Sequence, residues 1–334
     1  MTSGIFRYLR LVLIIVISGI LFQILMTFSS SKLQNGLTVA YSDPPVRGII
    51  ATLIRSTNHS ISLTINMMHS FLYFHRINGS YSYPFLIFHD ENFTSIMRQQ
   101  ILSCVLRRNK HIKISFAPVS FNTEVTINPG SPVHKPIGYR LMCRFWTYDV
   151  FYHPAILQGK YDYIMRMDDD SYLSDVVGSD IFLRVKNQRL DYAYRTTYWE
   201  NTPAMNPIVQ RFINGTGFQP GCIYNNFFVM RLKWFYESKR IHSFIRELMQ
   251  NNLMLREYIG DGCVHAVMLQ LENGVKIERL SNIPYGHNFH LLPPGHQQAT
   301  YMGVNAFYDE MNQSCHKFTI LRGDKGQLIR IKLS

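Results

Sequence analysis

Three short, almost uninterrupted apolar runs, each ending directly at polar side chains, constrain the fold of this chain more than any other feature. They cover Arg47–Arg55, Phe85–Phe88 and Tyr161–Met167. Runs of this kind are typical of strands that are buried on both faces, as in a parallel sheet. After the first run, apolar residues at 61, 65, 68 and 72 repeat with the spacing of a helix. Strands that alternate with helices predict an α/β fold with a mostly parallel sheet.

The rest of the chain continues this pattern less regularly. Residues 117–136 hold several prolines and a glycine, which predicts a loop. Hydrophobic spacing elsewhere predicts helices at 96–105, Tyr139–Tyr152, Lys233–Asn251 and Asp261–Leu271, and strands at Ile112–Phe116, Asp191–Thr196, Asn226–Arg231 and Val275–Glu278.

The N-terminal region contains an uncharged apolar run, Leu11–Phe28. A run of about 18 apolar residues is a candidate membrane span. Arg7 and Arg10 precede it, so the positive-inside rule leaves the tail in the cytosol. We therefore expect a cytosolic tail at 1–10, a transmembrane anchor at 11–28, a lumenal stem at 29–46 and a lumenal domain at 47–334. The alternative is a cleaved signal peptide, whose apolar core is usually shorter.

Charge and cysteine usage exclude some classes of protein. The net charge is +12, yet no block of five or six consecutive Lys or Arg occurs, which disfavours a nucleic-acid-binding tail. None of the five cysteines forms a CxxC pair, which argues against a zinc ribbon or a thioredoxin-like motif. In an oxidising lumen up to two disulfides could form, and the sequence does not give their pairing.

Three consecutive aspartates, Asp168–Asp170, follow the third apolar run directly. Ligands of open α/β sheets bind outside the carboxyl ends of the strands, which favours this cluster and also Asp90. In an extended segment residues i and i+2 point the same way, so Asp168 and Asp170 can face one ligand while Asp169 points away. Two such carboxylates form half of a site for Mg²⁺ or Mn²⁺. The alternative is a solvated acidic turn; an EF-hand loop is excluded because no glycine stands at its sixth position.

His265 is the candidate for a third protein ligand, because imidazole suits Mn²⁺ when carboxylates complete the site. Its alternative role is that of a core histidine on an apolar helix. Arg55, Arg144 and Arg166 lie near strand ends and are candidates for binding phosphates, although each could be an ordinary surface arginine.

Several segments, in order, resemble motifs of the fungal Kre2/Mnt1-type α-1,2-mannosyltransferases, and the resemblance covers roughly residues 47–290. The most specific match is Tyr139–Phe145, which is similar to "YRxMCRF". The others are Arg47–Arg55 with its "TLVRN" end, Phe88–Phe93 for "xNDxPF", Met165–Asp170 for "WRVEPDV", Gly260–His265 for "GDAPVH" and Ile283–His287 for "IGYxH".

The resemblance implies a type II Golgi enzyme with a GT-A-like fold, in which 47–334 is the catalytic domain. It further implies Mn²⁺, GDP-mannose as donor, mannose-terminated glycans on glycoproteins or glycolipids as acceptors, and retention of the anomeric configuration. Metal-binding roles pass to Asp168, Asp170 and His265, and Tyr139 lies near a tyrosine thought to act at the reaction centre. Asp90 and Asp261, in matching motifs, are expected at the donor site.

The chain also departs from the family motifs. Asp168 and Asp169 replace a Glu-Pro pair, so the site is closer to the DxD of other GT-A enzymes. The family's "NFEI", whose Glu has been proposed as a nucleophile, falls on Asn226–Val229, which contains no carboxylate, and "CHFW" is present only as Cys222–Tyr224. The front-side alternative to a covalent double displacement lets the donor phosphate help deprotonate the acceptor.

Three other functions remain open at this point. A UDP-galactose or UDP-N-acetylglucosamine transferase keeps the strand-Asp motif and changes the donor. A non-catalytic lumenal lectin would use the aspartates to bind Ca²⁺. A metal-dependent hydrolase is disfavoured, because the sequence shows no second cluster of carboxylates and histidines for a two-metal site.

Overall fold

The computed structural model describes residues 43–75, 81–107, 109–121, 123–131, 134–213, 221–288, 290–298, 300–301, 317–322 and 327–332. The expected cytosolic tail, anchor and nearly all of the expected stem lie outside these residues. Within the described part of the chain, no helix combines the length and the apolar character needed to cross a bilayer.

The centre of the fold is a seven-stranded mixed sheet in which only β9 runs against the other strands. This confirms the expected α/β fold with a mainly parallel sheet, and it follows from strands that are buried on both faces. The strands, in spatial order, are β10 (Ile277–Arg279), β6 (Tyr192–Tyr194), β9 (Phe227–Arg231), β4 (Tyr163–Met167), β1 (Gly48–Ile54), β2 (Phe85–His89) and β3 (Ile114–Pro118).

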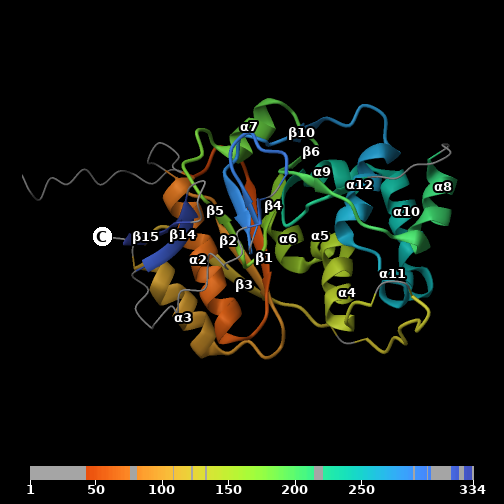
Figure 1. Ribbon diagram of the computed structural model, residues 1–334, viewed down its shortest axis with the longest axis horizontal. Helices are drawn as coiled ribbons and strands as arrows, with labels where there is room; N and C mark the ends of the chain where they lie inside the picture. Colours follow the sequence, from red (N-terminus) through yellow and green to blue (C-terminus); the bar gives the residue numbers. More distant parts are fainter. Residues whose placement is uncertain are drawn as a thin grey trace, which may run out of the picture. The chain divides into compact units, whose positions relative to one another are not determined.

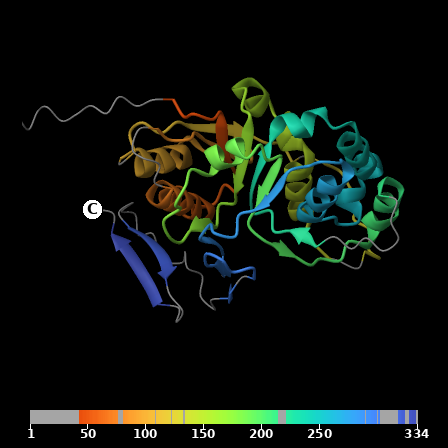
Figure 2. The ribbon, with the colours of Figure 1, turned by 90° about the horizontal axis from the view of Figure 1, so that it is seen from above.

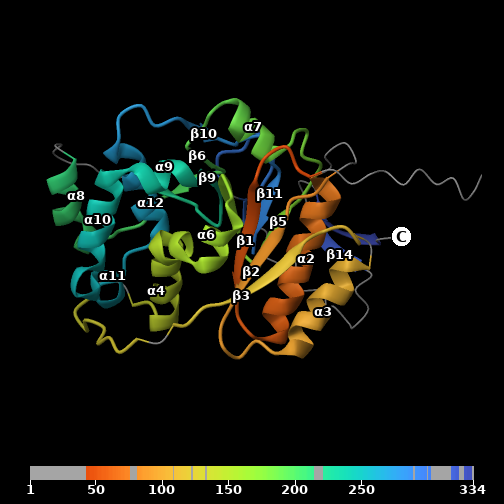
Figure 3. The same ribbon diagram turned by 180° about the vertical axis from the view of Figure 1, so that it is seen from behind.

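Helices cover both faces of this sheet, because neighbouring residues of each strand point to opposite sides. Ile50 and Ile54 of β1 belong to the apolar cluster under α2 (Asn58–Phe74) and α3 (Ser95–Leu106). Ile49 and Ala51 belong to the cluster under the helices of the other side. The two helical layers are visible on either side of the sheet in Figures 1 and 2, and from behind in Figure 3.

One predicted helix of the second helical layer is interrupted. The expected helix at 233–251 is divided at Ser238 into α9 (Leu232–Glu237) and α10 (Lys239–Met249). The extended backbone of Ser238 ends α9, and its hydroxyl caps α10 by accepting from the Ile241 amide. The other helices of this layer are α4 (Ile137–Arg144), the π-helical η1 (Phe145–Asp149), α5 (Val150–Tyr152), α6 (Pro154–Gly159), η2 (Pro203–Met205), α8 (Asn206–Phe212), η3 (Gln250–Asn252), α11 (Leu253–Arg256) and α12 (Asp261–Leu271). By contrast, α7 (Ile181–Asn187) packs on the same apolar cluster as α2 and α3.

Short strands that the sequence did not reveal complete the described fold. In the four-stranded sheet β13-β12-β11-β5, strand β11 pairs antiparallel with β5, and His287 lies opposite Ser171. This register brings His287 next to the aspartates that precede β5. The short strands are β5 (Ser171–Leu173), β7 (Thr197–Tyr198), β8 (Cys222–Ile223), β11 (Tyr285–His287), β12 (His290–Leu292), β13 (Thr300–Tyr301), β14 (Lys317–Arg322) and β15 (Gln327–Lys332).

Candidate active site

A cavity of about 790 Å³ opens at the carboxyl ends of the central strands. This is where open α/β sheets bind their ligands. Most of the residues that the sequence singled out line its wall, namely Arg55, Asp90, Tyr139, Arg166, Asp168, Asp170 and Asp261. Arg144 and His265 do not belong to this wall.

Three side chains at the centre of the cavity form a group that we call the metal group: Asp168, Asp170 and His287. One potential ligand atom from each lies within 4.8 Å of the others. His287 Nε2 is 2.9 Å from Asp170 Oδ1 and 3.8 Å from Asp168 Oδ2. Two carboxylate oxygens and an imidazole nitrogen are a donor set that fits Mn²⁺, so the residues present agree with the expected metal.

Neighbouring polar side chains fix the orientation of the metal group. The Tyr224 hydroxyl lies 2.8 Å from His287 Nδ1, and the Asn226 amide contacts both Asp168 and His287. Such contacts to the second ring nitrogen orient a ligating histidine. Burial lowers the pKa of His287, but the carboxylates of Asp170 and Asp168 outweigh it and raise this pKa above its ordinary value. The two carboxylates therefore favour the positively charged form of the His287 imidazole when no metal is bound.

Asp169 takes a different direction from its two neighbours. Its carboxylate accepts a hydrogen bond from the Ser60 hydroxyl in the first turn of α2. Burial, together with the nearby charge of Asp170, raises the pKa of Asp169 to about 7. Asp169 and Asp170 lie in a turn, closed by the Ser171 amide donating to the Asp168 carbonyl oxygen at 3.0 Å. Asp169 therefore points away from Asp168 and Asp170 as expected, but because of this turn and not because the segment is extended.

Arg166 has a positioning role that the sequence did not predict. Its side chain is buried, its Nε lies 2.6 Å from Asp168 Oδ1, and its guanidinium is 2.5 Å from Asp261 Oδ2. The guanidinium also stacks over the Trp146 ring at 4.4 Å. Arg166 is therefore paired with two carboxylates and holds Asp168 in place. This positioning role replaces the expected direct contact with a donor phosphate.

His265 occupies the core, which corrects the expectation that it completes the metal site. The side chain is fully buried, with Nδ1 2.8 Å from the Tyr192 hydroxyl and Nε2 3.1 Å from the Trp146 carbonyl oxygen. Burial lowers the pKa of His265 to about 4, so the ring is neutral. It lies one turn beyond Asp261 on α12, beneath the cavity wall, and both ring nitrogens have partners. The third residue of the metal group is His287.

Arg144 is also placed outside the cavity. Its Nε lies 3.1 Å from the Asp149 carboxylate, across the π-helical turn that follows α4. The side chain is committed to this local ion pair, so the expected role in binding a phosphate is not supported. Proximity to a motif in the sequence was a poor guide to the direction of this side chain.

Arg55 and Asp90 line the same cavity next to the ends of β1 and β2. The Asp90 carboxylate accepts hydrogen bonds from the Ser56 hydroxyl at 2.6 Å and from the backbone amides of Ser56 and Asn92 at 3.1 and 2.9 Å. These bonds order the loop after each strand. They leave a charged, hydrogen-bonding surface beside the metal group.

Two residues of the opposite end of the cavity complete the wall. Tyr139, on α4, is mostly buried, and burial raises the pKa of its phenol. Glu200, just after β7, accepts hydrogen bonds from the hydroxyls of Tyr258 at 2.7 Å and Tyr198 at 3.0 Å. No signal in the sequence distinguished Glu200, because it lies in no strand-end cluster and in no motif.

Comparison with known proteins finds one sequence relative and several solved structures with the same fold. No protein-family model matches the chain. A sequence relative is alpha-1,2 mannosyltransferase KTR1 of Saccharomyces cerevisiae, 24% identical over 184 residues, which are 48% of this chain and 45% of that protein. The chain thus matches less than half of the relative's length.

Solved structures share the fold. Core-mannan synthase A of Aspergillus fumigatus, in its Mn/GDP form, aligns with a TM-score of 0.64 at 17% identity over 80% of this chain and 82% of that chain. Mannosyltransferase Ktr4p of S. cerevisiae in complex with GDP aligns with a TM-score of 0.60 at 16% identity over 77% and 75%. The family resemblance is confirmed.

Proposed function

We propose that this chain is a metal-dependent retaining glycosyltransferase that transfers mannose from GDP-mannose to mannose-terminated glycans, forming an α-1,2 linkage. The observation that carries the proposal is the metal group at the strand ends of a cavity with the volume for a nucleotide sugar. A sequence relative and two solved structures with the same fold are mannosyltransferases by name.

Asp168, Asp170 and His287 would hold Mn²⁺, or Mg²⁺ in its place. The metal would supply Lewis-acid stabilisation of the charge on the departing nucleoside diphosphate. Arg166 keeps Asp168 oriented, and Tyr224 does the same for His287. Arg55 and Asp90 would contact the nucleotide, and Tyr139 would lie at the reacting end.

The chain's own residues favour a front-side reaction over a covalent intermediate. Phe228 stands where the family motif has its proposed nucleophile, and it is fully buried in the core. In the front-side reaction the acceptor hydroxyl attacks the anomeric carbon while the bond from that carbon to the phosphate oxygen breaks. The hydroxyl proton passes to the departing phosphate, so that no protein base is consumed.

The proposed setting is the Golgi or endoplasmic reticulum membrane, with the catalytic domain in the lumen. It rests on the apolar run at 11–28 and on the resemblance to type II Golgi enzymes. The proposed acceptors are glycoproteins or glycolipids that reach this compartment.

A thermal-shift screen tests the donor and the metal together. GDP is expected to stabilise the protein in the presence of Mn²⁺, because a ligand that binds only the folded state raises its apparent stability. Stabilisation by UDP alone would point to a UDP-sugar donor, and a response to Ca²⁺ with neither nucleotide would favour the lectin. Incubation with nucleotide sugars and simple mannosides, read by mass, then identifies the product. Activity that survives both Asp168→Ala and Asp170→Ala would refute the assignment of the metal group.

A further inference from the structure

The carboxylate of Glu200 is held by neutral donors only. The hydroxyls of Tyr198 and Tyr258 both donate to it. Burial and the nearby Glu200 charge raise the pKa of each phenol, so both keep their protons. A carboxylate offers about four lone-pair positions, and two phenols occupy half of them. The remaining positions are available to a ligand in the cavity.

Glu200 shares with Asp90 and Asp169 the lack of an ion pair among the described residues, and this separates it from the carboxylates around Arg166 and His287. Asp168 and Asp261 are paired with Arg166, and Asp170 is paired with His287. In the described part of the chain, no Lys, Arg or His forms an ion pair with Glu200. Its charge is therefore not neutralised by the protein, and it faces the space that a substrate would fill.

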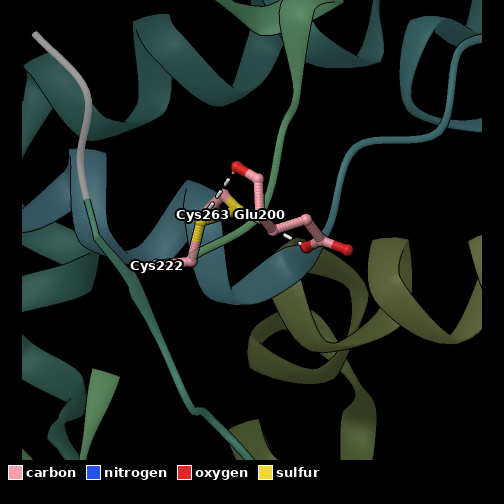
Figure 4. A group of neighbouring side chains, drawn as sticks. All are labelled: Glu200, Cys222 and Cys263. Atoms are coloured by element: carbon pink, nitrogen blue, oxygen red, sulfur yellow. Dashed lines mark hydrogen bonds between the residues drawn. A yellow bond between two sulfur atoms is a disulfide. The ribbon is translucent and has the colours of Figure 1, made fainter. Parts of the chain in front are cut away.

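The backbone around Glu200 is built to accommodate this carboxylate. A Cβ on Gly260 would lie 2.3 Å from Glu200 Oε2, so any larger residue there would displace the carboxylate from its present position. A disulfide between Cys222 and Cys263 lies beside it and joins β8 to α12 (Figure 4). The three side chains are close enough to suggest a metal site, but the sulfurs bond to each other and offer no thiolate. Cys263 stands where the family motif has proline.

The order of the strands places Glu200 relative to the donor. Asp90 and Arg55 follow β2 and β1, Asp168 follows β4, and Glu200 comes after β6 and β7. In the sheet β6 lies on the side of β4 away from β1 and β2. The cavity therefore leads from the proposed nucleotide end, past the metal group, to Glu200. The sugar of a donor whose diphosphate lies on the metal group extends toward this end.

We propose that the Glu200 end of the cavity binds the hexosyl group being transferred, and that Glu200 accepts hydrogen bonds from its hydroxyls. This inference rests on the proposed function and adds the subsite for the donor sugar. Hydrogen bonds from sugar hydroxyls to an ionised acceptor are stronger than those to a neutral one. The phenols of Tyr198 and Tyr258 fix the carboxylate, so little side-chain freedom is lost on binding.

Glu200→Gln tests the proposal, because it removes the charge and keeps the size. Stabilisation of the variant by Mn²⁺ and nucleoside diphosphate, which lacks the sugar, is expected to equal that of the unmodified protein. Affinity for the intact nucleotide sugar and the rate of transfer are expected to fall roughly 10- to 100-fold, the range for loss of a charged hydrogen bond. The acceptor KM is expected to stay constant. Glu257→Gln is the matched control, since Glu257 binds Asn128 and does not line the cavity.

The outcomes of this test distinguish failure of the donor-sugar subsite from failure of the proposed glycosyltransferase function. Unchanged transfer by Glu200→Gln, or a change confined to the acceptor KM, would overturn the donor-sugar subsite and leave the enzyme assignment intact. No response of the unmodified protein to any nucleotide would overturn both. If Glu200→Gln fails to fold, Glu200→Asp keeps the charge but withdraws it by one methylene. The same selective loss of transfer is expected, and a full rate in that variant would count against the subsite.

Discussion

His265 makes a pH-dependent contribution to stability that distinguishes a core histidine from a metal ligand. Burial lowers the pKa of His265 to about 4 in the folded protein. The value in the unfolded chain is about 6.5. Between these two values the unfolded chain binds more protons than the folded one. The contribution of His265 is therefore complete above about pH 6.5 and is lost as the pH falls toward about 4.

The size of this effect follows from the two pKa values. Proton linkage gives a loss of about 2 kcal/mol between about pH 7 and about pH 5 from this one group. His75, whose pKa burial also lowers to about 4, adds a similar slope to the unmodified protein. A variant that removes only His265 therefore isolates its share.

Denaturant unfolding of the unmodified protein and of His265→Gln at several pH values measures that share. Near neutral pH the variant is expected to be less stable, because the contacts with Tyr192 and Trp146 are disturbed. The difference is expected to shrink by about 2 kcal/mol on going to about pH 5. His134→Gln is the control, since an exposed side chain should change stability by less than about 0.5 kcal/mol. Curves that run parallel for His265→Gln and the unmodified protein would refute the buried, neutral histidine.

Three further variants, one of them with two substitutions, test other parts of the site. His287→Ala is expected to abolish the Mn²⁺-dependent thermal shift and also to lower the stability without metal, because Asp170 loses its partner. A retained shift would exclude His287 as a ligand. Arg166→Met leaves two carboxylates without their partner and should cost about 3–5 kcal/mol in denaturant unfolding; a loss below about 1 kcal/mol would contradict the buried ion pairs. Replacing Cys222 and Cys263 by Ser opens a cross-link with a sequence separation of 41 residues and should cost about 2–4 kcal/mol by the same assay. Equal unfolding midpoints would show that this disulfide does not stabilise the fold.

The sequence predicted much of the central sheet because several of its buried strands are short, continuous apolar runs that can be recognised without knowledge of the tertiary structure. The apolar runs at Arg47–Arg55 and Phe85–Phe88 became β1 and β2 almost unchanged, and α12 spans the predicted Asp261–Leu271. Strands of two or three residues, such as β5 and β11, have no periodic pattern long enough to detect. The break at Ser238 depends on a single capping hydroxyl, which the apolar spacing on either side concealed.

The sequence by itself determined where the carboxylates of the site lie, because a strand that ends at Asp168–Asp170 delivers them to the edge of the sheet whatever surrounds it. It did not determine their partners. The pairing of β11 with β5 brings His287 to the metal group, although more than a hundred residues separate it from Asp168. The sequence named His265 as the third ligand, with a core role as the alternative. It is a core residue, since the direction of a helical side chain depends on which face is packed. Long-range strand pairing and helix packing therefore decided which histidine and which glutamate face the cavity.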